Sequence, residues 1–271
     1  MAVLSIQSTV TYGHVGNAAA VPALRVLGHE VWPIATVTFS NHPGHGHWTG
    51  RTRSAAELAD LFRGLRGLGA LARCDAVLSG YLGRPSTARV VAQAVRAVRR
   101  ANPDGFYVLD PVIGDDGRIY VAPGVVDAIR CRLLPLADII TPNRYELGWL
   151  TGRTVDDTDA VVTAARALCR GSLGQVVVTG IVQGERISAC AVTADTVRWV
   201  AAPYRQARFR GAGDLFSALY TAHFIDTRDI ARALEAAMSG LDLVTRRTLE
   251  LGSDELALGQ CLAELATRRG R

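Results

Sequence analysis

The stretch Arg210-Gly-Ala-Gly-Asp214 combines the residue types that transfer of a phosphoryl group requires. Two glycines flank a small residue at the start of a helical pattern, so several backbone amides can point toward one spot, where the helix N-terminus adds partial positive charge. Asp214 falls in the first turn of this helix, beside the predicted anion hole. An aspartate there can cap the helix, or it can accept a proton from an attacking hydroxyl while the amides stabilise the transferring group. The motif alone leaves both interpretations open.

Two further acidic residues follow predicted strands. Asp110 closes the apolar run Phe106–Leu109, and Glu146 lies one helical turn after Asn143, directly behind Ile-Ile-Thr-Pro. The spacing of three residues places Asn143 and Glu146 on the same face of a helix. Since ligands of open α/β sheets bind at the carboxyl ends of the strands, both carboxylates are expected at one edge, where they suit a magnesium ion held largely through water. Turn aspartates and first-turn glutamates are also common, so the anion hole in the same chain is what favours a functional interpretation.

Two glycine-rich stretches could be interpreted as cofactor or metal sites. Gly13-His-Val-Gly-Asn17 lacks the third glycine of a dinucleotide-binding loop, which favours a turn that lines a pocket beside Ser8. His42, His45 and His47 have a spacing that a zinc ion could use, but no helix would preorganise them. A mobile loop that covers a substrate is therefore the favoured interpretation.

The chain contains no lysine: all 30 of its Lys and Arg residues are arginine. This excludes the lysine-containing phosphate loop and a catalytic Schiff base, so backbone amides, arginine or a metal must handle any phosphates. The net charge of +5 comes from arginines spread along the chain, with short runs such as Arg268 to Arg271. We expect no nucleic-acid partner, because no basic stripe is interleaved with aromatic residues.

Short apolar runs alternate with longer helical patterns, which predicts an α/β fold with a mainly parallel sheet between helices and a single domain over residues 1–271. The expected strands are Val3–Gln7, Val31–Phe39, Ala76–Ser79, Phe106–Leu109, Asp138–Thr141, Val176–Thr179, Ile187–Val192 and Thr196–Val200. The expected helices cover about 16–27, 54–68, 86–101, 123–133, 143–151, 158–170, 213–225, 229–247 and 253–268. Ser54 and Glu57 form a predicted capping box at the start of the second helix.

The cysteines and the N-terminus bear on location. Five cysteines lie far apart with no C-x-x-C pair, which argues against a disulfide framework or a structural zinc site. The start MAVLSIQS has no targeting pattern, and no segment reaches 18 apolar residues. We expect a cytoplasmic protein with no membrane association.

Taken together, six motifs resemble pyridoxal kinases of the ribokinase-like superfamily, in order along most of the chain. They are Leu-Ser-Ile-Gln-Ser at 4–8, Thr-Val-Thr-Phe-Ser-Asn-His at 36–42, Val-Leu-Ser-Gly-Tyr at 77–81, Asp-Pro-Val at 110–112, Ala-Asp-Ile-Ile-Thr-Pro-Asn at 137–143 and Gly-Ala-Gly-Asp at 211–214. The resemblance implies a three-layer α/β/α ribokinase-like fold, usually a homodimer, that moves the γ-phosphate of ATP to the 5′-hydroxyl of pyridoxal.

At the transfer site, the resemblance makes Asp214 the base and assigns the anion hole to the amides of Gly211, Ala212 and Gly213. It also implies Mg²⁺, often with K⁺ or Na⁺. The residues that it assigns to ATP or to the metal are Asp110, Thr141, Asn143, Glu146 and Thr179, of which Asp110, Thr141 and Glu146 would serve the metal. The segment from Gly114 to Tyr120 corresponds to a loop that covers the nucleotide.

For the substrate ring, the resemblance implies that Ser8 bonds the pyridine nitrogen and that Val15 and Tyr81 sandwich the ring, while Phe39 and His42 line the same pocket. Chemistry agrees, because a flat ring packs well between a tyrosine face and an aliphatic wall, and a hydroxyl can donate to a ring nitrogen. The absence of lysine also means that an aldehyde substrate meets no side-chain amine.

Two residues depart from the pattern of the family. Pro43 stands where many relatives carry a threonine facing the ring substituents, so one substrate hydrogen bond is lost. Arg210 is bulky and charged where relatives have a small or apolar residue, and it either assists the phosphates or faces solvent. Both departures leave open which of pyridoxal, pyridoxine and pyridoxamine is preferred.

Two other functions remain to be weighed. A hydroxymethylpyrimidine kinase of the same superfamily acts on a similar ring-bearing alcohol, but such enzymes commonly carry a cysteine in place of Asp214. A non-catalytic protein that binds B6 vitamers would retain the pocket, and the intact Asp214, Asp110 and Glu146 weigh against it. A sugar kinase is disfavoured because the double-glycine sugar-binding segment near the N-terminus is absent.

Overall fold

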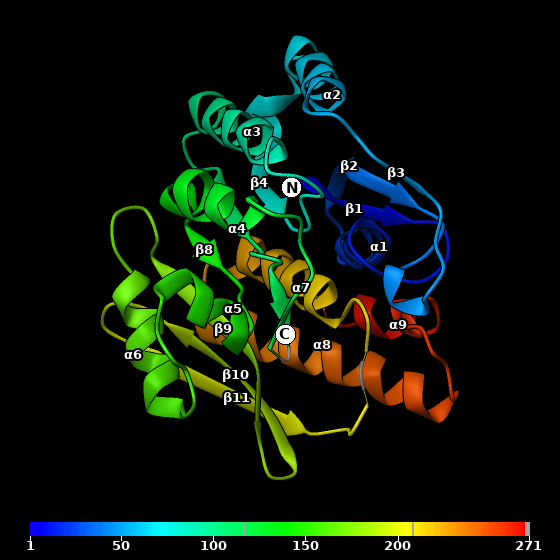
Figure 1. The fold of residues 1–271 in the computed structure, drawn as a ribbon, viewed down its shortest axis with the longest axis vertical. Helices are drawn as coiled ribbons and strands as arrows, with labels where there is room; N and C mark the ends of the chain where they lie inside the picture. Colours follow the sequence, from blue (N-terminus) through cyan, green and yellow to red (C-terminus); the bar gives the residue numbers. More distant parts are fainter. Residues whose placement is uncertain (116, 208, 269–271) are drawn as a thin grey trace.

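The computed structural model describes residues 1–115, 117–207 and 209–268, and in this part of the chain nine strands form one sheet in the order β11-β10-β9-β8-β5-β4-β1-β2-β3 (Figure 1). The strands are β1 (Ala2–Val10), β2 (Glu30–Phe39), β3 (Gly50–Thr52), β4 (Cys74–Ser79), β5 (Phe106–Leu109), β8 (Ile139–Ile140), β9 (Gln175–Gln183), β10 (Arg186–Val192) and β11 (Val197–Pro203). The six from β9 to β2 in this order pair in parallel, whereas β3, β10 and β11 pair antiparallel at the two edges. A separate hairpin joins β6 (Gly114–Asp115) and β7 (Arg118–Ile119).

Helices cover both faces of the sheet, which confirms the predicted three-layer α/β/α fold. One face carries α2 (Ala55–Gly67), α3 (Thr87–Ala101), α4 (Val125–Ala128), α5 (Arg144–Thr151) and α6 (Thr158–Leu168). The other carries α1 (Asn17–Val26), α7 (Ala212–Thr227), α8 (Ile230–Glu250) and α9 (Leu258–Ala266). Successive strand residues alternate between the two cores, as in β5, where Tyr107 and Leu109 join one core and Phe106 and Val108 the other.

Helix α7 lies in the middle of the molecule, packed against α1 and α8 (Figure 1). Its residues from Leu215 to Ala222 are all buried, so this part of the helix is enclosed by the core around its whole circumference. The N-terminus of α7 therefore has a fixed position relative to the sheet, which is a requirement for an anion hole.

The structure confirms the predicted elements and corrects several boundaries. The expected strand from Val3 to Gln7 continues to Val10, with a shift in its register to β2 between Gln7 and Thr9. The helix expected at 123–133 divides into α4 and a π-helical turn, Ile129–Leu133, and the helix expected at 253–268 begins only at Leu258. The strands β3, β6 and β7 were not predicted, because two or three residues carry no readable periodicity.

The capping box of α2 is confirmed: Ser54 Oγ accepts a hydrogen bond from the Glu57 amide at 3.2 Å, and Glu57 accepts one from the Ser54 amide at 2.7 Å. Among the described residues, no helix is long and apolar enough to cross a membrane. Asp116 in the expected nucleotide-covering segment and residues 269–271 of the arginine tail lie outside the described residues.

Candidate active site

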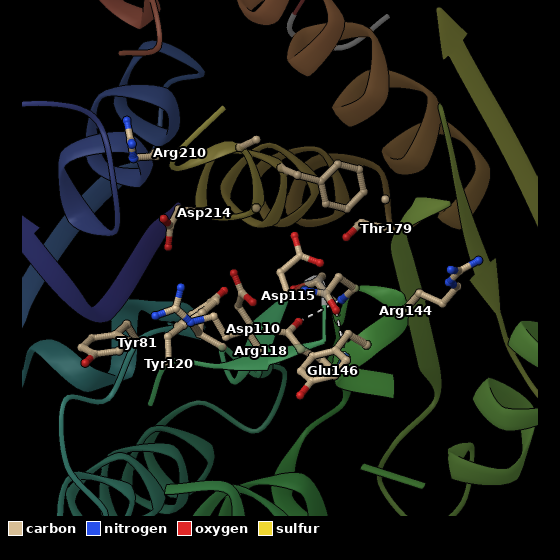
Figure 2. Close-up of a pocket in the computed structure, with 18 of the residues that line it drawn as sticks. Tyr81, Asp110, Asp115, Arg118, Tyr120, Arg144, Glu146, Thr179, Arg210 and Asp214 are labelled. Atoms are coloured by element: carbon tan, nitrogen blue, oxygen red, sulfur yellow. Dashed lines mark hydrogen bonds between the residues drawn. The ribbon is translucent and has the colours of Figure 1, made fainter. Parts of the chain in front are cut away.

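One cleft of about 1630 Å³ crosses the carboxyl ends of the parallel strands, and all fourteen predicted site residues line it. They are Ser8, Val15, Phe39, His42, Tyr81, Asp110, Thr141, Asn143, Glu146, Thr179, Gly211, Ala212, Gly213 and Asp214. Figure 2 labels Tyr81, Asp110, Glu146, Thr179 and Asp214 among them. The sheet edge brings them together from positions that span more than 200 residues of sequence. The rule that polar residues after parallel strands share one site therefore holds for this chain.

The residues of the predicted anion hole lie at the N-terminus of α7. Gly211 is the residue before the helix and has a φ of 82°, in the left-handed region that favours glycine. A Cβ there would overlap the carbonyl oxygen of His14, so this glycine also lets the two segments approach closely. Asp214 lies in the first helical turn, half-buried, and Figure 2 shows it at the edge of the cleft. Burial raises its pKa to about 6, against the opposing effect of a hydrogen bond from the backbone of Gly16.

Asp110 ends a chain of hydroxyl groups. Ser217 Oγ donates to Asp110 Oδ2 at 3.0 Å, and the Thr141 and Ser217 hydroxyl oxygens lie 2.8 Å apart. Because Ser217 has one proton and gives it to Asp110, Thr141 is the donor in the second bond, and the lone pairs of its oxygen stay available. Burial, followed by the charges of Glu146 and Asp214, raises the pKa of Asp110 well above its ordinary range.

Glu146 is held by backbone amides. Oε1 accepts from the amides of Ile113 at 2.9 Å and Gly114 at 3.4 Å, and Oε2 accepts from the Asn143 amide at 2.9 Å. The Asn143 side chain accepts from the Glu146 amide at 2.8 Å and donates to the Gly114 carbonyl at 2.8 Å. The pair is thus a capping box that also fastens the β6–β7 hairpin to α5. Burial raises the pKa of Glu146 to about 8, despite these amides.

Oxygen donors in this region fit a hard divalent cation. One oxygen of Asp110 and the oxygen of Thr141 accept no hydrogen bond from the described residues, and both line the cleft. Among these residues no three His, Cys, Asp or Glu side chains gather to hold a metal alone. Magnesium commonly binds through one or two carboxylates together with water and substrate phosphates, so the arrangement suits it.

The opposite end of the cleft is a small apolar pocket. Val10, Val15, Val37 and Phe39 form one buried cluster, against which Tyr81 packs. Ser8 lies at the register shift in β1, inside the strand rather than after it as expected, and such irregularities re-aim a side chain. No side-chain hydrogen bond joins Ser8 to any described residue, and Ser8 lines the cleft. A polar group is therefore available next to an apolar wall.

The histidines are not arranged as a zinc site. His42 lines the cleft, and its Nδ1 accepts a hydrogen bond from the Gly44 amide at 3.0 Å. Burial, followed by the charge of Arg210, lowers the pKa of His42. His45 instead contacts Glu255, with 2.6 Å between Nε2 and Oε1. Three consecutive residues of this loop, His42 to Gly44, line the cleft, and the mobile cover over a substrate stays a prediction.

Three residues near the site were missed by the sequence analysis. Ser217 lies one turn after Asp214, a spacing that could have drawn attention to it. Glu255 falls where a helix was expected, and no local pattern ties it to a histidine 210 residues away. Tyr120 lines the cleft together with Glu146, Asp110 and Asp214. Burial, followed by the charges of these acidic side chains, raises the pKa of Tyr120.

Arginine supplies the positive charge around the cleft. Among the residues that the structure describes, five arginines line it: Arg118, Arg130, Arg144, Arg153 and Arg210. They share the cleft with the α7 N-terminus and with acidic side chains that include the buried or half-buried Asp110, Glu146 and Asp214. In a chain without lysine, these are the groups available to bind phosphates.

Comparison with known proteins identifies the family. Residues 70–258 match the family model described as phosphomethylpyrimidine kinase. The pyridoxal kinase PdxY of Granulibacter bethesdensis is 44% identical, with 94% of this chain and 93% of the relative covered. The structure of pyridoxal kinase from Leishmania donovani in complex with ADP and pyridoxamine superimposes with a TM-score of 0.91 at 32% identity, covering 97% of this chain and 95% of the other.

A putative phosphomethylpyrimidine kinase from Bacteroides thetaiotaomicron, in a crystal form with pyridoxal, is also similar, with a TM-score of 0.89, 26% identity and coverage of 97% and 95%. Relatives named pyridoxal kinase match over nearly their whole length, whereas the phosphomethylpyrimidine kinase model matches from residue 70 onward. This chain belongs to the pyridoxal kinase family, with a ribokinase-like fold.

Proposed function

We propose that this chain transfers the γ-phosphoryl group of ATP to the 5′-hydroxyl of pyridoxal. The observation that carries the proposal is the cleft itself, which joins a ring-sized apolar pocket to an aspartate at a helix N-terminus. The family supplies the reaction class, and the cleft supplies residues of the right chemistry for each part of it.

The apolar end would hold the pyridine ring. The faces of the ring would pack between Tyr81 and Val15, which belong to one cluster with Phe39. The free hydroxyl of Ser8 would donate a hydrogen bond to the ring nitrogen, and His42 would line the edge of the pocket. This arrangement would leave the 5′-hydroxymethyl group directed toward Asp214.

Beside the ring pocket, Asp214 would accept the proton of the 5′-hydroxyl as that oxygen attacks the γ-phosphorus. A pKa of about 6 keeps the carboxylate ionised at neutral pH and close in basicity to what general-base catalysis favours. The amides of Gly211 and Gly213 would stabilise the charge on the transferring group, which in phosphoryl transfer is the main catalytic requirement. The amide of Ala212, which was assigned to the same role, donates to the Phe209 carbonyl oxygen at 3.2 Å in this structure.

The nucleotide would extend from this point along α5 and β9. Thr179 and the cleft arginines other than Arg210 would contact the phosphates, and Asn143 with Glu146 would hold the β6–β7 hairpin beside them. An adjoining pocket of about 100 Å³, lined by apolar side chains that include Phe209, Phe216 and Leu241, would take the base. It shares Thr179 and Ala212 with the main cleft, which supports this assignment.

Asp110 and Thr141 would hold Mg²⁺, with Glu146 supporting the same region, and the ion would neutralise charge on the phosphates. Without a cation, the three buried or half-buried carboxylates repel one another, as the raised pKa of Asp110 reflects. A bound K⁺ or Na⁺, a homodimer and a cytoplasmic location remain predictions.

The related structures support B6 vitamers as substrates. The Leishmania donovani enzyme has been crystallised with ADP and pyridoxamine and with ADP and pyridoxine. Hydroxymethylpyrimidine is the alternative substrate, favoured by the description of the matching family model. Asp214, in the place of the cysteine common in those enzymes, favours the vitamer.

Incubation of the purified protein with Mg-ATP and pyridoxal, followed by mass spectrometry of the product, tests the proposal. We expect pyridoxal 5′-phosphate together with an equal amount of ADP, and Asp214→Asn as the negative control. ADP release without a phosphorylated vitamer, or pyridoxal binding with no turnover, would reject the kinase assignment for this substrate.

A further inference from the structure

The loop from Asn41 to Trp48, here called the histidine loop, lies at the ring end of the cleft and has little apolar packing of its own. Its residues from Pro43 to Trp48 are exposed, and its regular structure is a three-residue turn, Pro43–His45. The indole of Trp48 packs against Phe39 with ring centroids 4.2 Å apart. A short exposed loop keeps one position only when other contacts offset the entropy of ordering it.

Arg210 supplies one of these contacts. Its Nη2 donates to the Gly44 carbonyl oxygen at 3.0 Å. A Cβ on Gly44 would lie 2.9 Å from Arg210 Nε and 2.8 Å from His42 Nδ1, so the guanidinium and the imidazole enclose this glycine. Figure 2 shows the Arg210 side chain directed away from Asp110 and Glu146. From the sequence, Arg210 was expected either to assist the phosphates or to face solvent. The structure shows neither arrangement, because the guanidinium bonds to the Gly44 carbonyl oxygen.

Glu255 supplies the second contact and joins two loops. It is buried, with 8% of its surface exposed. Oε1 lies 2.6 Å from His45 Nε2, while Oε2 accepts a hydrogen bond from the His14 amide at 3.2 Å. The residue after His14 is Val15, which lines the ring pocket. One carboxylate therefore fixes both loops that border the ring.

These contacts form a closed circuit around the ring end of the cleft. The histidine loop contacts Arg210, which directly precedes Gly211 of the anion hole. Gly211 packs against the carbonyl of His14, and the His14 amide bonds to Glu255, which returns to the histidine loop through His45. A displacement at one point of the circuit is thus passed to both the ring pocket and the phosphoryl site.

We propose that Arg210 and Glu255 are positioning residues that hold the histidine loop over the substrate ring and keep the ring aligned with the anion hole. The inference rests on the proposed function, because it takes the substrate to be a B6 vitamer. Neither residue touches the reacting atoms; both act through the loop, Glu255 by way of His45.

Steady-state kinetics with Arg210→Ala, Glu255→Ala and His45→Ala tests this role. We expect KM for pyridoxal to rise roughly tenfold in each, the effect of one charge-assisted hydrogen bond, with KM for ATP within about twofold of wild type. Glu255→Ala combined with His45→Ala should lose little more than either alone, since the two residues share one contact. His45→Gln retains an N–H donor for Glu255 and should restore most of the affinity. Glu250→Ala, an exposed carboxylate paired with Arg246 and Arg247, is the matched control.

Hydrogen exchange gives a readout that does not depend on turnover. Residues 41–48 should exchange at least fivefold faster in Glu255→Gln and Arg210→Ala than in wild type, while α2 stays unchanged. Wild-type protein without pyridoxal turnover would reject the proposed function, and the exchange comparison would still decide whether these residues hold the loop. Unchanged exchange overturns the inference, and so does a rise in KM for ATP that equals or exceeds the rise for pyridoxal.

Discussion

Replacing Gly211 by alanine tests whether the anion hole and the ring pocket depend on one another. The φ of 82° disfavours any side chain by about 1–2 kcal/mol. The new Cβ would also overlap the His14 carbonyl oxygen, and reaching the 3.0 Å that Cβ atoms keep from other heavy atoms requires the segments to separate by more than 1 Å. A misplacement of about 1 Å at a reacting centre can lower the rate about 100-fold. We therefore expect kcat to fall by about two orders of magnitude.

Stopped-flow or coupled measurement of ADP release with pyridoxal gives kcat, and thermal unfolding gives the accompanying loss of stability. Gly213→Ala is the structural control, because a Cβ at Gly213 meets no heavy atom within 4 Å and the residue lies inside α7. Its Tm should equal or exceed that of wild type, whereas the Tm of Gly211→Ala should fall. A Gly211→Ala enzyme with kcat within threefold of wild type would contradict this prediction. The close approach of Gly211 to the His14 carbonyl would then have no role in aligning the ring with the predicted anion hole.

Three further predictions concern the carboxylates and the ring pocket. Asp214→Asn should reduce kcat by roughly 100- to 10,000-fold and largely keep the affinity for pyridoxal, which calorimetry measures; turnover within tenfold of wild type would exclude the base assignment. In a pH–rate profile of the wild type, kcat should fall as the pH drops through about 6, where Asp214 takes up a proton. Asp110→Asn should raise the Tm of the ligand-free protein by roughly 3 °C or more at pH 8 and by less at pH 5. The reason is that a carboxyl group with a raised pKa in the folded state destabilises the fold increasingly as the pH rises toward that pKa. Equal Tm values for variant and wild type at both pH values would contradict this. Tyr81→Ala should raise KM for pyridoxal several-fold more than KM for ATP, and an unchanged pyridoxal KM would remove Tyr81 from the ring pocket.

The sequence predicted the layered fold and the contents of the cleft because both follow from local patterns. Apolar runs with strand length alternated with helical periodicity, and parallel strands must present their carboxyl ends at one edge. Asp110, which directly follows a predicted strand, was therefore expected at this edge and lines the cleft, whereas Tyr81 and Thr179 were assigned to the site by the family resemblance and line the cleft too. The cap of α5 was also visible, as the spacing of Asn143 and Glu146.

The contacts that connect distant segments could not be predicted. Glu255 and His45 meet across 210 residues, and Arg210 and Gly44 across 166. Such pairs depend on how loops pack, and nothing in either segment specifies the partner. The irregularity at Ser8 was missed for a related reason, since the register of β1 depends on both neighbouring strands. Sequence motifs thus indicated which residues form the site but not how its loops are held.

We propose that this cleft phosphorylates a B6 vitamer. The most direct test compares the specificity constant for pyridoxal with that for hydroxymethylpyrimidine. Purified protein with Mg-ATP would be supplied with pyridoxal or with hydroxymethylpyrimidine, and kcat/KM would be measured for each by ADP formation. We expect kcat/KM for pyridoxal to exceed kcat/KM for hydroxymethylpyrimidine at least tenfold. A preference for the pyrimidine, or no turnover of pyridoxal in the presence of potassium, would contradict it.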